Sequence, residues 1–243
     1  MSRDDAMEFF GGTVDSKYMV FSNAADDGLD WTFGWTGRVQ FAVVLQRGDD
    51  ADNGIEADNN EFNNNVLPRS NPQIYNITLC GDPDRNEGNE SPRGANLRRG
   101  TAFTIRNFLL TGFKSTGFQI SDAATTTQVT NGTSFMDAGV AWNMGVTGSA
   151  PVAPMHSSVQ AFITTGRFSN IVLNQDPGVS TAACSNHTAP NPQPSSIATL
   201  AGGQLAPAIP PNDGFFEVTT YIGAIPPAPA PNWMAGWTSF PQN

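Results

Sequence analysis

Acidic residues recur in a short motif near the N-terminus, at a spacing that could carry ion chemistry. The pattern Asp-[Asp/Asn]-[Ala/Gly]-apolar-[Asp/Glu]-apolar occurs three times, with first residues Asp4, Asp26 and Asp52. If the chain stacks these copies, carboxylates about 5 Å apart repel one another by roughly 1 kcal/mol in water and by more at lower dielectric. Such a column must bind a cation, retain protons at raised pKa values or spread into solvent.

The ligand atoms of this motif indicate which cation it would hold. They are all oxygens, with no His or Cys, and oxygen ligands at flexible spacing favour calcium over transition metals. We therefore predict calcium as the cofactor of the second and third copies. The predicted metal ligands are Asp26, Asp27, Asp30, Asp52, Glu56 and Asp58. The alternative is a solvated acidic face, which is how most surface carboxylates behave.

Two basic residues follow the acidic copies and raise the question of catalysis. Paired carboxylates can hydrolyse glycosidic bonds, and a polysaccharide lyase would need a basic group beside calcium to remove a proton from the sugar. Arg98 and Arg99 are predicted to bind such a ligand. The alternative is a turn pair that neutralises carboxylates of the preceding copy. The sequence therefore leaves open whether the protein is an enzyme.

Aromatic residues crowd the turn after the second acidic copy. An exposed indole could stack on the apolar face of a sugar. Strand alternation turns Trp31 inward, so Trp35 is the predicted glycan-binding ring. The alternative is a buried cluster that packs the core.

Two kinds of short strand alternate along the chain and would position these residues. The acidic copies form one series, which continues without the acids at 94–97 and 117–120. The second series has the pattern apolar-x-Asn-apolar-x-apolar at 74–79, 105–110 and 168–173. Alternation with period 2 after Gly or Asn turns is typical of strands.

The repeat length decides between two all-β architectures. Short strands that recur about every 22 to 31 residues are typical of a parallel β-solenoid, in which each strand stacks on its counterpart one turn later. We predict a right-handed parallel β-helix; an antiparallel β-sandwich is the alternative. The recurrent Asn76, Asn107 and Asn170 are predicted to form a ladder of amides along one corner.

We interpret 1–243 as a single β-helix domain with long loop insertions. Regular coils are expected over 1–122, an insertion and the last clear coil over 123–175, and a Pro-rich C-terminal cap over 176–243. Helical patterns are almost absent, because Pro and Gly interrupt every long window.

Both ends of the chain carry features that suggest how the solenoid is closed. At the C-terminal end, 215–223 is predicted to be a strand, and with Trp233, Trp237 and Phe240 it would cap the last coil. At the other end, Met1 enters a coil almost directly. We therefore expect a truncated N-terminus, with self-association through the exposed first rung as one consequence.

The charge distribution restricts the partners. The net charge is −10; residues 1–90 hold 17 Asp and Glu against 6 Lys and Arg, and residues 91–243 hold 5 against 6. An acidic chain without a basic stripe is a poor partner for nucleic acid or anionic lipid. The longest apolar run, 41–45, is far too short to span a bilayer. A polysaccharide or cell-surface glycan is the predicted partner.

Composition and cysteine content suggest where the protein acts. Only two Lys and many Asn, Thr, Gly and Pro are typical of an exported β protein, although no signal peptide is visible. Cys80 and Cys184 could form one disulfide or none.

Several long motifs also resemble a known family. They are DDGLDWTFGWTGRVQF, DNGIEADNN, LPRSNPQIYNITL, LRRGTA and the ending YIGA with NWMAGWTSF. The chain, from about residue 10 to its end, resembles bacterial exported or surface proteins expected to form pectate-lyase-like right-handed β-helices. The resemblance implies the fold and export to the extracellular space or cell surface, and no particular activity.

From these observations we predict an extracellular, noncatalytic glycan-binding or structural β-helix module with a calcium-competent acidic column. A polysaccharide lyase or glycoside hydrolase of the pectate-lyase-like type is the alternative.

Overall fold

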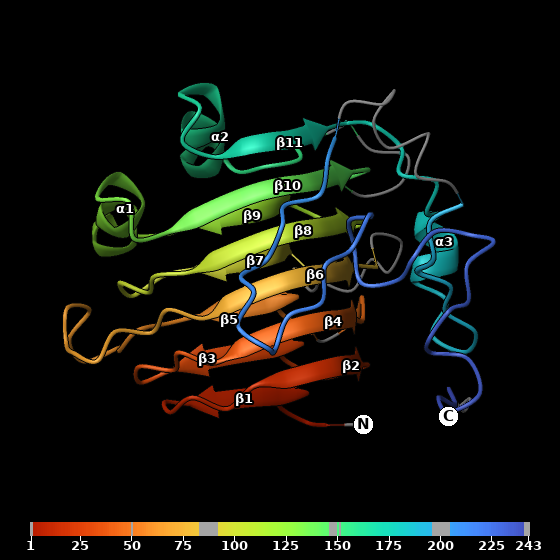
Figure 1. The fold of residues 1–243 in the computed structure, drawn as a ribbon, viewed down its shortest axis with the longest axis horizontal. Coiled ribbons are helices and arrows are strands. Elements are labelled where there is room, and N and C mark those ends of the chain that lie inside the picture. The colour runs from red at the N-terminus through yellow and green to blue at the C-terminus, as the bar shows by residue number, and fades with distance from the viewer. Residues whose placement is uncertain are drawn as a thin grey trace.

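Two parallel sheets stack their strands in chain order, so each of the first five turns of the coil contributes one strand to each sheet, and the last turn contributes a strand to one sheet only (Figure 1). The computed structural model describes residues 2–49, 51–82, 92–145, 150, 152–195 and 205–240. The five-stranded sheet contains β1 (Met7–Phe10), β3 (Leu29–Thr32), β5 (Ile55–Ala57), β7 (Arg93–Leu97) and β9 (Thr116–Ile120). The six-stranded sheet contains β2 (Ser16–Ser22), β4 (Arg38–Leu45), β6 (Gln73–Cys80), β8 (Thr104–Thr111), β10 (Phe135–Trp142) and β11 (Ser169–Leu173).

Every strand pair in both sheets is parallel, and the predicted counterparts lie side by side. Leu29 of β3, for example, is opposite Met7 of β1 and Ile55 of β5. A parallel pair needs a crossover connection, which each half-turn of the coil supplies. The β-helix prediction is therefore confirmed, and the antiparallel sandwich is excluded.

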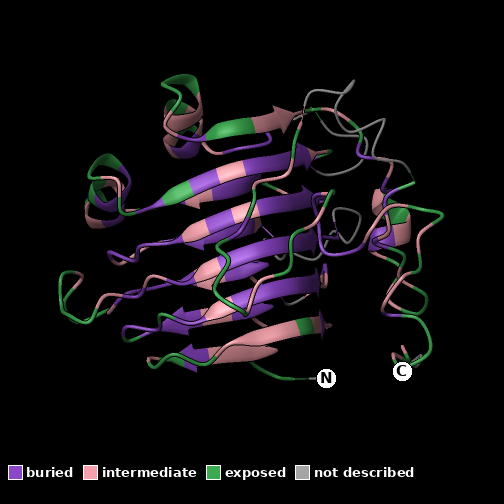
Figure 2. Cartoon of the chain, in the orientation of Figure 1, coloured by how far each residue is buried: buried purple, intermediate pink, exposed green. Residues whose placement is uncertain are grey.

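The core lies between the sheets and is filled by the inward residues of each strand. Strand interiors are buried from β3 to β10, whereas the first strands and β11 are more open (Figure 2). On this first rung Phe10 is 64% and Val14 58% exposed. Self-association through this rung stays a prediction.

A left-handed residue interrupts each strand of the six-stranded sheet at the same level. These residues are Tyr18, Phe41, Asn76, Asn107, Ala138 and Asn170, all with φ between 52° and 60°. This conformation bends the strand and places two consecutive side chains outward, as in a β-bulge. Asn tolerates it best among non-glycine residues, which explains why Asn recurs here.

The predicted ladder of hydrogen-bonded amides is wrong, because the side chains of these asparagines bond other partners. Asn107 is fully buried, but its amide donates to the carbonyl of Ala208 at 2.9 Å, and its oxygen accepts the N–H of the same residue at 2.7 Å. Asn170 bonds Asp137 rather than a neighbouring Asn. The asparagines therefore hold other segments, and no Asn–Asn bond connects these three positions.

The region expected to be an insertion contains a regular strand. β10 pairs with β8 on one side and β11 on the other. The sequence prediction missed it because Ala138, rather than Asn, occupies its left-handed position.

Helices also occur, contrary to expectation: α1 (Ala123–Thr130), α2 (Ser157–Thr164) and the short α3 (Thr181–Cys184). Asp122 caps α1 by accepting the N–H of Thr125. The backbone N–H of Ile120, at the end of β9, donates to Ser158 in the first turn of α2, so α2 covers the open edge of the five-stranded sheet. No helix in the described part of the chain is long and apolar enough to cross a membrane.

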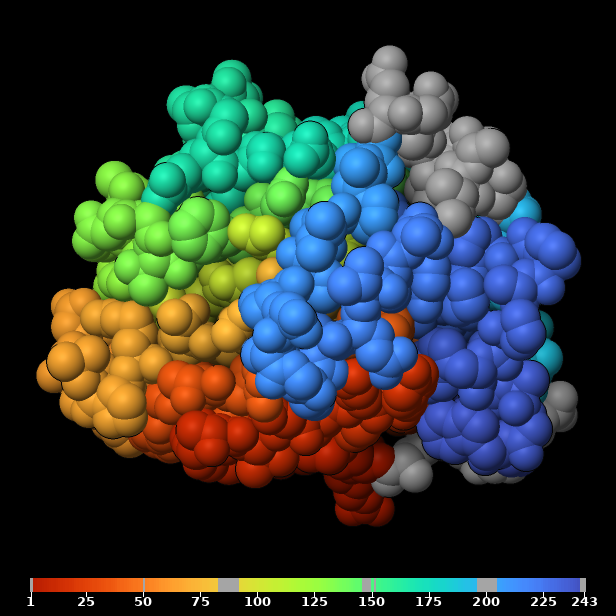
Figure 3. Space-filling model, in the orientation of Figure 1, coloured from red at the N-terminus to blue at the C-terminus, as the bar shows by residue number. Residues whose placement is uncertain are grey.

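Residues 205–225, here called the strap, run along the outer face of the six-stranded sheet (Figures 1 and 3). The strap contains no strand, so the prediction for 215–223 is wrong. Side-chain amides of the sheet satisfy its backbone instead: Gln40 accepts the N–H of Glu217 at 2.8 Å and donates to its carbonyl at 2.7 Å. The C-terminal segment therefore covers the side of the solenoid rather than its last rung.

A disulfide fastens the C-terminal part to the coil. Cys80, at the end of β6, is bonded to Cys184 of α3, 104 residues away. Both cysteines are buried in an apolar cluster that includes Ala224 and Ile225 of the strap. The pairing that the sequence left open is therefore present.

Candidate functional site

The three acidic copies stack as predicted, on the outer side of the five-stranded sheet. Glu8 of β1 is opposite Asp30 of β3, and Asp30 is opposite Glu56 of β5. In the next strand the position is taken by Asn96, which ends the carboxylate column. The register of the parallel sheet therefore places one carboxylate per coil over the first three coils.

The turns before these strands bring further carboxylates together. Three groups have one carboxylate oxygen per residue within 4.8 Å of the others. They are Asp4 with Asp5 and Asp26, Asp5 with Asp27 and Asp30, and Asp26 with Asp27 and Asp52. Asp5, Asp26 and Asp27 each belong to two groups, and Asp27, only 3% exposed, is the buried member among them.

Backbone hydrogen bonds hold the central carboxylates in place. Asp5 accepts the N–H of Asp27 at 2.9 Å, and Asp27 accepts the N–H of Asn53 one coil later at 2.5 Å. Each carboxylate thus satisfies the turn of the following coil. This structural role explains why an acid, or its amide, occupies the second position of every copy.

Burial and like charge make these carboxylates poor anions. Burial, with Glu56 nearby, raises the pKa of Asp27 to about 10, and the same causes raise the pKa of Asp30 to about 9. Burial raises the pKa of Asp5 to about 6, in spite of the hydrogen bond from Asp27. Asp30 Oδ1 is buried and has no hydrogen-bond partner in the described part of the chain. The cluster therefore lacks positive charge that would satisfy it.

The two arginines neutralise the other end of the predicted site. Arg98 donates to Asp58 at 2.9 Å and forms an ion pair with Glu56, and Arg99 donates to Asp58 at 2.6 Å. Burial still raises the pKa of Glu56 to about 7, although Arg98 opposes this. The arginines thus take the arrangement of a turn pair bound to the preceding copy.

The six predicted ligands therefore separate into two sets. The structure brings Asp26, Asp27, Asp30 and Asp52 into the carboxylate groups, and it assigns Glu56 and Asp58 to the arginines. Asp4 and Asp5 join the first set and were not among the predicted ligands. Their places as the first two residues of the first motif copy were the signal that could have identified them.

Trp35 is not an exposed ring, so that expectation is wrong. Its side chain is fully buried, its ring stacks on Phe9 with centroids 4.2 Å apart, and its Nε1 donates to the carbonyl of Val14 at 3.1 Å. Trp31 faces the core as predicted and donates to Thr101. The aromatic turn is therefore part of the core.

Comparison with known families agrees with this architecture. A family model for the pectate-lyase-like beta helix domain matches residues 1–238. No curated protein and no solved structure matches the sequence at a significant level. The chain belongs to the pectate-lyase-like beta helix domain family, and its fold is a right-handed parallel β-helix.

Proposed function

We propose that this member of the family is a noncatalytic, glycan-binding β-helix module of an extracellular or cell-surface protein, with calcium bound by its acidic column. One observation carries the calcium proposal. Carboxylates of three successive coils converge on Asp27, which is almost completely buried, while a buried oxygen of Asp30 lacks a partner in the described chain.

Calcium suits this cluster for two reasons. The available ligands are carboxylate oxygens on separate turns, and calcium accepts six to eight oxygens in irregular geometry. A divalent ion would also offset the burial and the like-charge repulsion that together raise the pKa values of Asp27 and Asp30. We propose Asp5, Asp26, Asp27, Asp30 and Asp52 as the ligand set.

The same geometry argues against the alternative, a polysaccharide lyase or glycoside hydrolase. A lyase needs a basic group free to take a proton, but Arg98 and Arg99 are both held by carboxylates. A hydrolase needs two accessible carboxyl groups on either side of the scissile bond, whereas Asp27 is buried. These contacts favour binding over catalysis.

The disulfide supports an extracellular location. Structural disulfides persist in oxidising compartments and are rare in the cytosol. Cys80 and Cys184 join segments 104 residues apart, which is a structural bond rather than a local redox motif. Glycans are abundant in the same compartments.

Calcium titration of thermal stability tests the proposal. In saturating calcium we expect a higher melting temperature than in EDTA, by about 2.7 kcal/mol of stabilisation at 100 times the dissociation constant. Asp27→Asn keeps an acceptor oxygen for the Asn53 N–H but removes the central charge, so it should abolish the calcium effect. Glu61→Gln, an exposed acid outside the three groups, is the matched control. Equal melting in calcium and EDTA would exclude the site.

Two further assays separate binding from catalysis. A glycan array probed with the calcium-loaded protein should give specific signals. Incubation with uronic-acid polymers should release no unsaturated, ultraviolet-absorbing products. Release of such products by the native protein, lost in Arg98→Ala, would instead establish the lyase.

A further inference from the structure

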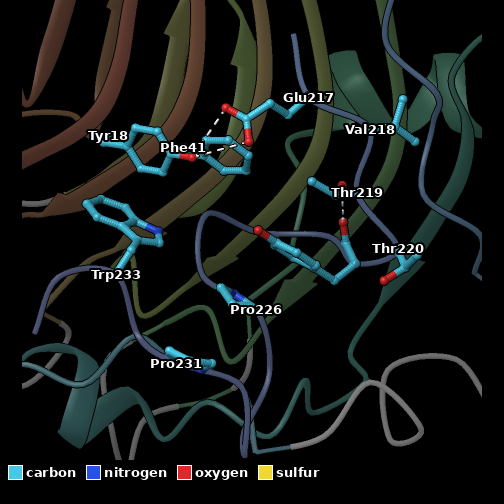
Figure 4. Close-up of a pocket in the computed structure, with 10 residues that line it drawn as sticks. Tyr18, Phe41, Glu217, Val218, Thr219, Thr220, Pro226, Pro231 and Trp233 are labelled. Carbon is cyan, nitrogen blue, oxygen red and sulfur yellow. Dashed lines mark hydrogen bonds between the residues drawn. The ribbon is translucent and has the colours of Figure 1, made fainter.

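A cavity of about 360 Å³ lies between the six-stranded sheet and the C-terminal segment, on the other sheet from the acidic column (Figure 4). Its lining combines aromatic rings with hydroxyl groups and one carboxylate, that of Glu217. This size is within the range of roughly 300–1,000 Å³ that is usual for small-molecule sites. None of the residues predicted from the sequence to bind a ligand lines it.

The aromatic wall comes from the left-handed column and from the chain end. Tyr18 stacks on Phe41 with ring centroids 4.9 Å apart, and Trp233 meets Tyr18 nearly at right angles, with centroids 5.4 Å apart. Phe41 is 3% exposed and forms the base, whereas Tyr18 is 41% exposed. An apolar ring face is therefore open to the cavity.

Polar groups stand beside this wall. The Tyr18 hydroxyl donates to Glu217, which also forms an ion pair with Lys17 at 2.8 Å. Thr220 lines the cavity and is exposed, and its hydroxyl makes no hydrogen bond within the described part of the chain. The cavity thus offers an acceptor and a hydroxyl, while Lys17 already balances the charge of Glu217.

The walls are held in position without a ligand. Gln40 bonds both backbone groups of Glu217, and Asn76 donates to Thr219 and to the carbonyl of Tyr221. Trp233 donates to the carbonyl of Ala224 at 2.8 Å. A preformed site loses little conformational entropy when it is filled.

We propose that this cavity binds one residue of an uncharged glycan, with the sugar ring against Tyr18 and Trp233 and its hydroxyls bonded to Glu217 and Thr220. The inference rests on the glycan-binding function proposed above and assigns it a place. A sugar combines an apolar ring face with hydroxyls, and the cavity has a partner for each.

Charge decides against the other small ligands that aromatic sites accept. A quaternary ammonium would need an uncompensated carboxylate, but Lys17 is paired with Glu217. A uronic acid would find no free cation, because the described lining has no Lys or Arg and Lys17 is held by Glu217, and the chain has a net charge of −10. An uncharged sugar avoids both costs.

Titration with defined sugars tests the assignment. The probes are four neutral disaccharides, cellobiose, mannobiose, galactobiose and chitobiose, and one uronic-acid disaccharide, each followed by calorimetry and tryptophan fluorescence in calcium. We expect at least one neutral disaccharide to bind and the uronic acid to bind more weakly. Trp233→Ala should lower the affinity about tenfold, which corresponds to about 1.4 kcal/mol.

Two variants guard against loss of folding as the cause. Thr220→Val removes an exposed hydroxyl without removing any hydrogen bond of the described chain, and it should weaken binding several-fold at an unchanged melting temperature. Phe62→Ala, an aromatic residue 82% exposed in a distant loop, should bind as the native protein does.

Two results would overturn the cavity assignment. Either no neutral disaccharide binds, or Trp233→Ala and Thr220→Val both bind disaccharides with the affinity of the native protein. If array signals persist in these variants, the glycan-binding function stands and only its place is wrong. A silent array together with no binding of any disaccharide would overturn both.

Discussion

The two sheets of this solenoid differ in how their rows of polar side chains are satisfied. Stacking places equivalent residues in rows, so a polar group at a repeated position recurs in successive coils. On the six-stranded sheet, Gln40, Asn76 and Asn107 carry amides, and the strap gives each of them backbone partners. On the five-stranded sheet and in the turn before β3, Asp30 and Asp27 carry carboxyl groups, which when ionised can only accept hydrogen bonds.

The two rows differ in which groups can satisfy their polar side chains. An amide is neutral and can be satisfied by another segment of the same chain, at little electrostatic cost. A row of carboxylates raises the pKa of its members until a proton or a cation joins it. The strap side is therefore closed by the chain itself, and the acidic side depends on the solution.

The largest expected effect concerns the closure of the strap side. In the double variant Cys80→Ala, Cys184→Ala the unfolded chain regains the freedom of a loop of about 100 residues, which corresponds to about 4.7 kcal/mol in the chain-entropy model. We expect a loss of about 2–5 kcal/mol in denaturant titration. A loss below about 1 kcal/mol would show that packing alone holds this segment.

An amide of the row should have the next largest effect. Asn107→Leu removes the side-chain partners of Ala208 and puts a branched residue at φ 56°, so we expect a loss of at least about 2 kcal/mol. Asn107→Gly keeps the left-handed backbone and should isolate the hydrogen bonds. Asn131→Leu, at an exposed helix end, should stay within about 0.5 kcal/mol. Equal losses of stability in Asn107→Leu and Asn131→Leu would show that the amide row does not stabilise the strap side.

The acidic row should show its effect in the pH dependence of stability. Because the pKa values of Asp27 and Asp30 are raised, the folded protein holds protons that the unfolded chain releases above about pH 4. Stability in EDTA should therefore fall as the pH rises from about 4 towards 10.

We expect stability in EDTA to fall between pH 5 and pH 8 by about 1.4 kcal/mol per pH unit for each proton that the folded chain retains and the unfolded chain has released. Asp27→Asn should flatten this slope, and calcium should remove it in the native protein. A flat profile in EDTA would mean that the row is already satisfied.

The coil could be predicted from the sequence because two separate series of strands, one acidic and one Asn-centred, repeat along the chain. Each acidic copy and the strands at 74–79 and 105–110 were placed beside their true neighbours, and the register of Glu8, Asp30 and Glu56 was correct. The strand at 168–173 was expected next to 105–110, but β10 lies between them. β10 was missed because the strands of this sheet were identified by a central asparagine. The physical requirement at that position is a left-handed backbone, which Ala138 meets without the expected side chain.

The sites were harder to predict because they depend on contacts between distant segments. The partners of Arg98 and Arg99 lie some 40 residues earlier, and the burial of Trp35 depends on Phe9 of the first strand. The cavity joins Tyr18 to Glu217, 199 residues later. No local pattern shows where an irregular strap will lie, since side chains of the sheet, and not a strand pairing, set its path.

The column of left-handed residues also bears on how the coil assembles. In an ordinary parallel sheet, a slip of two residues keeps every side chain on its proper face and is therefore easily tolerated. Here such a slip would move a bend against a straight segment and place Phe41 or Asn76 beside a residue that is not bent. The bend therefore marks one register as correct at each turn, so a growing solenoid can add coils in sequence without accumulating misaligned strands.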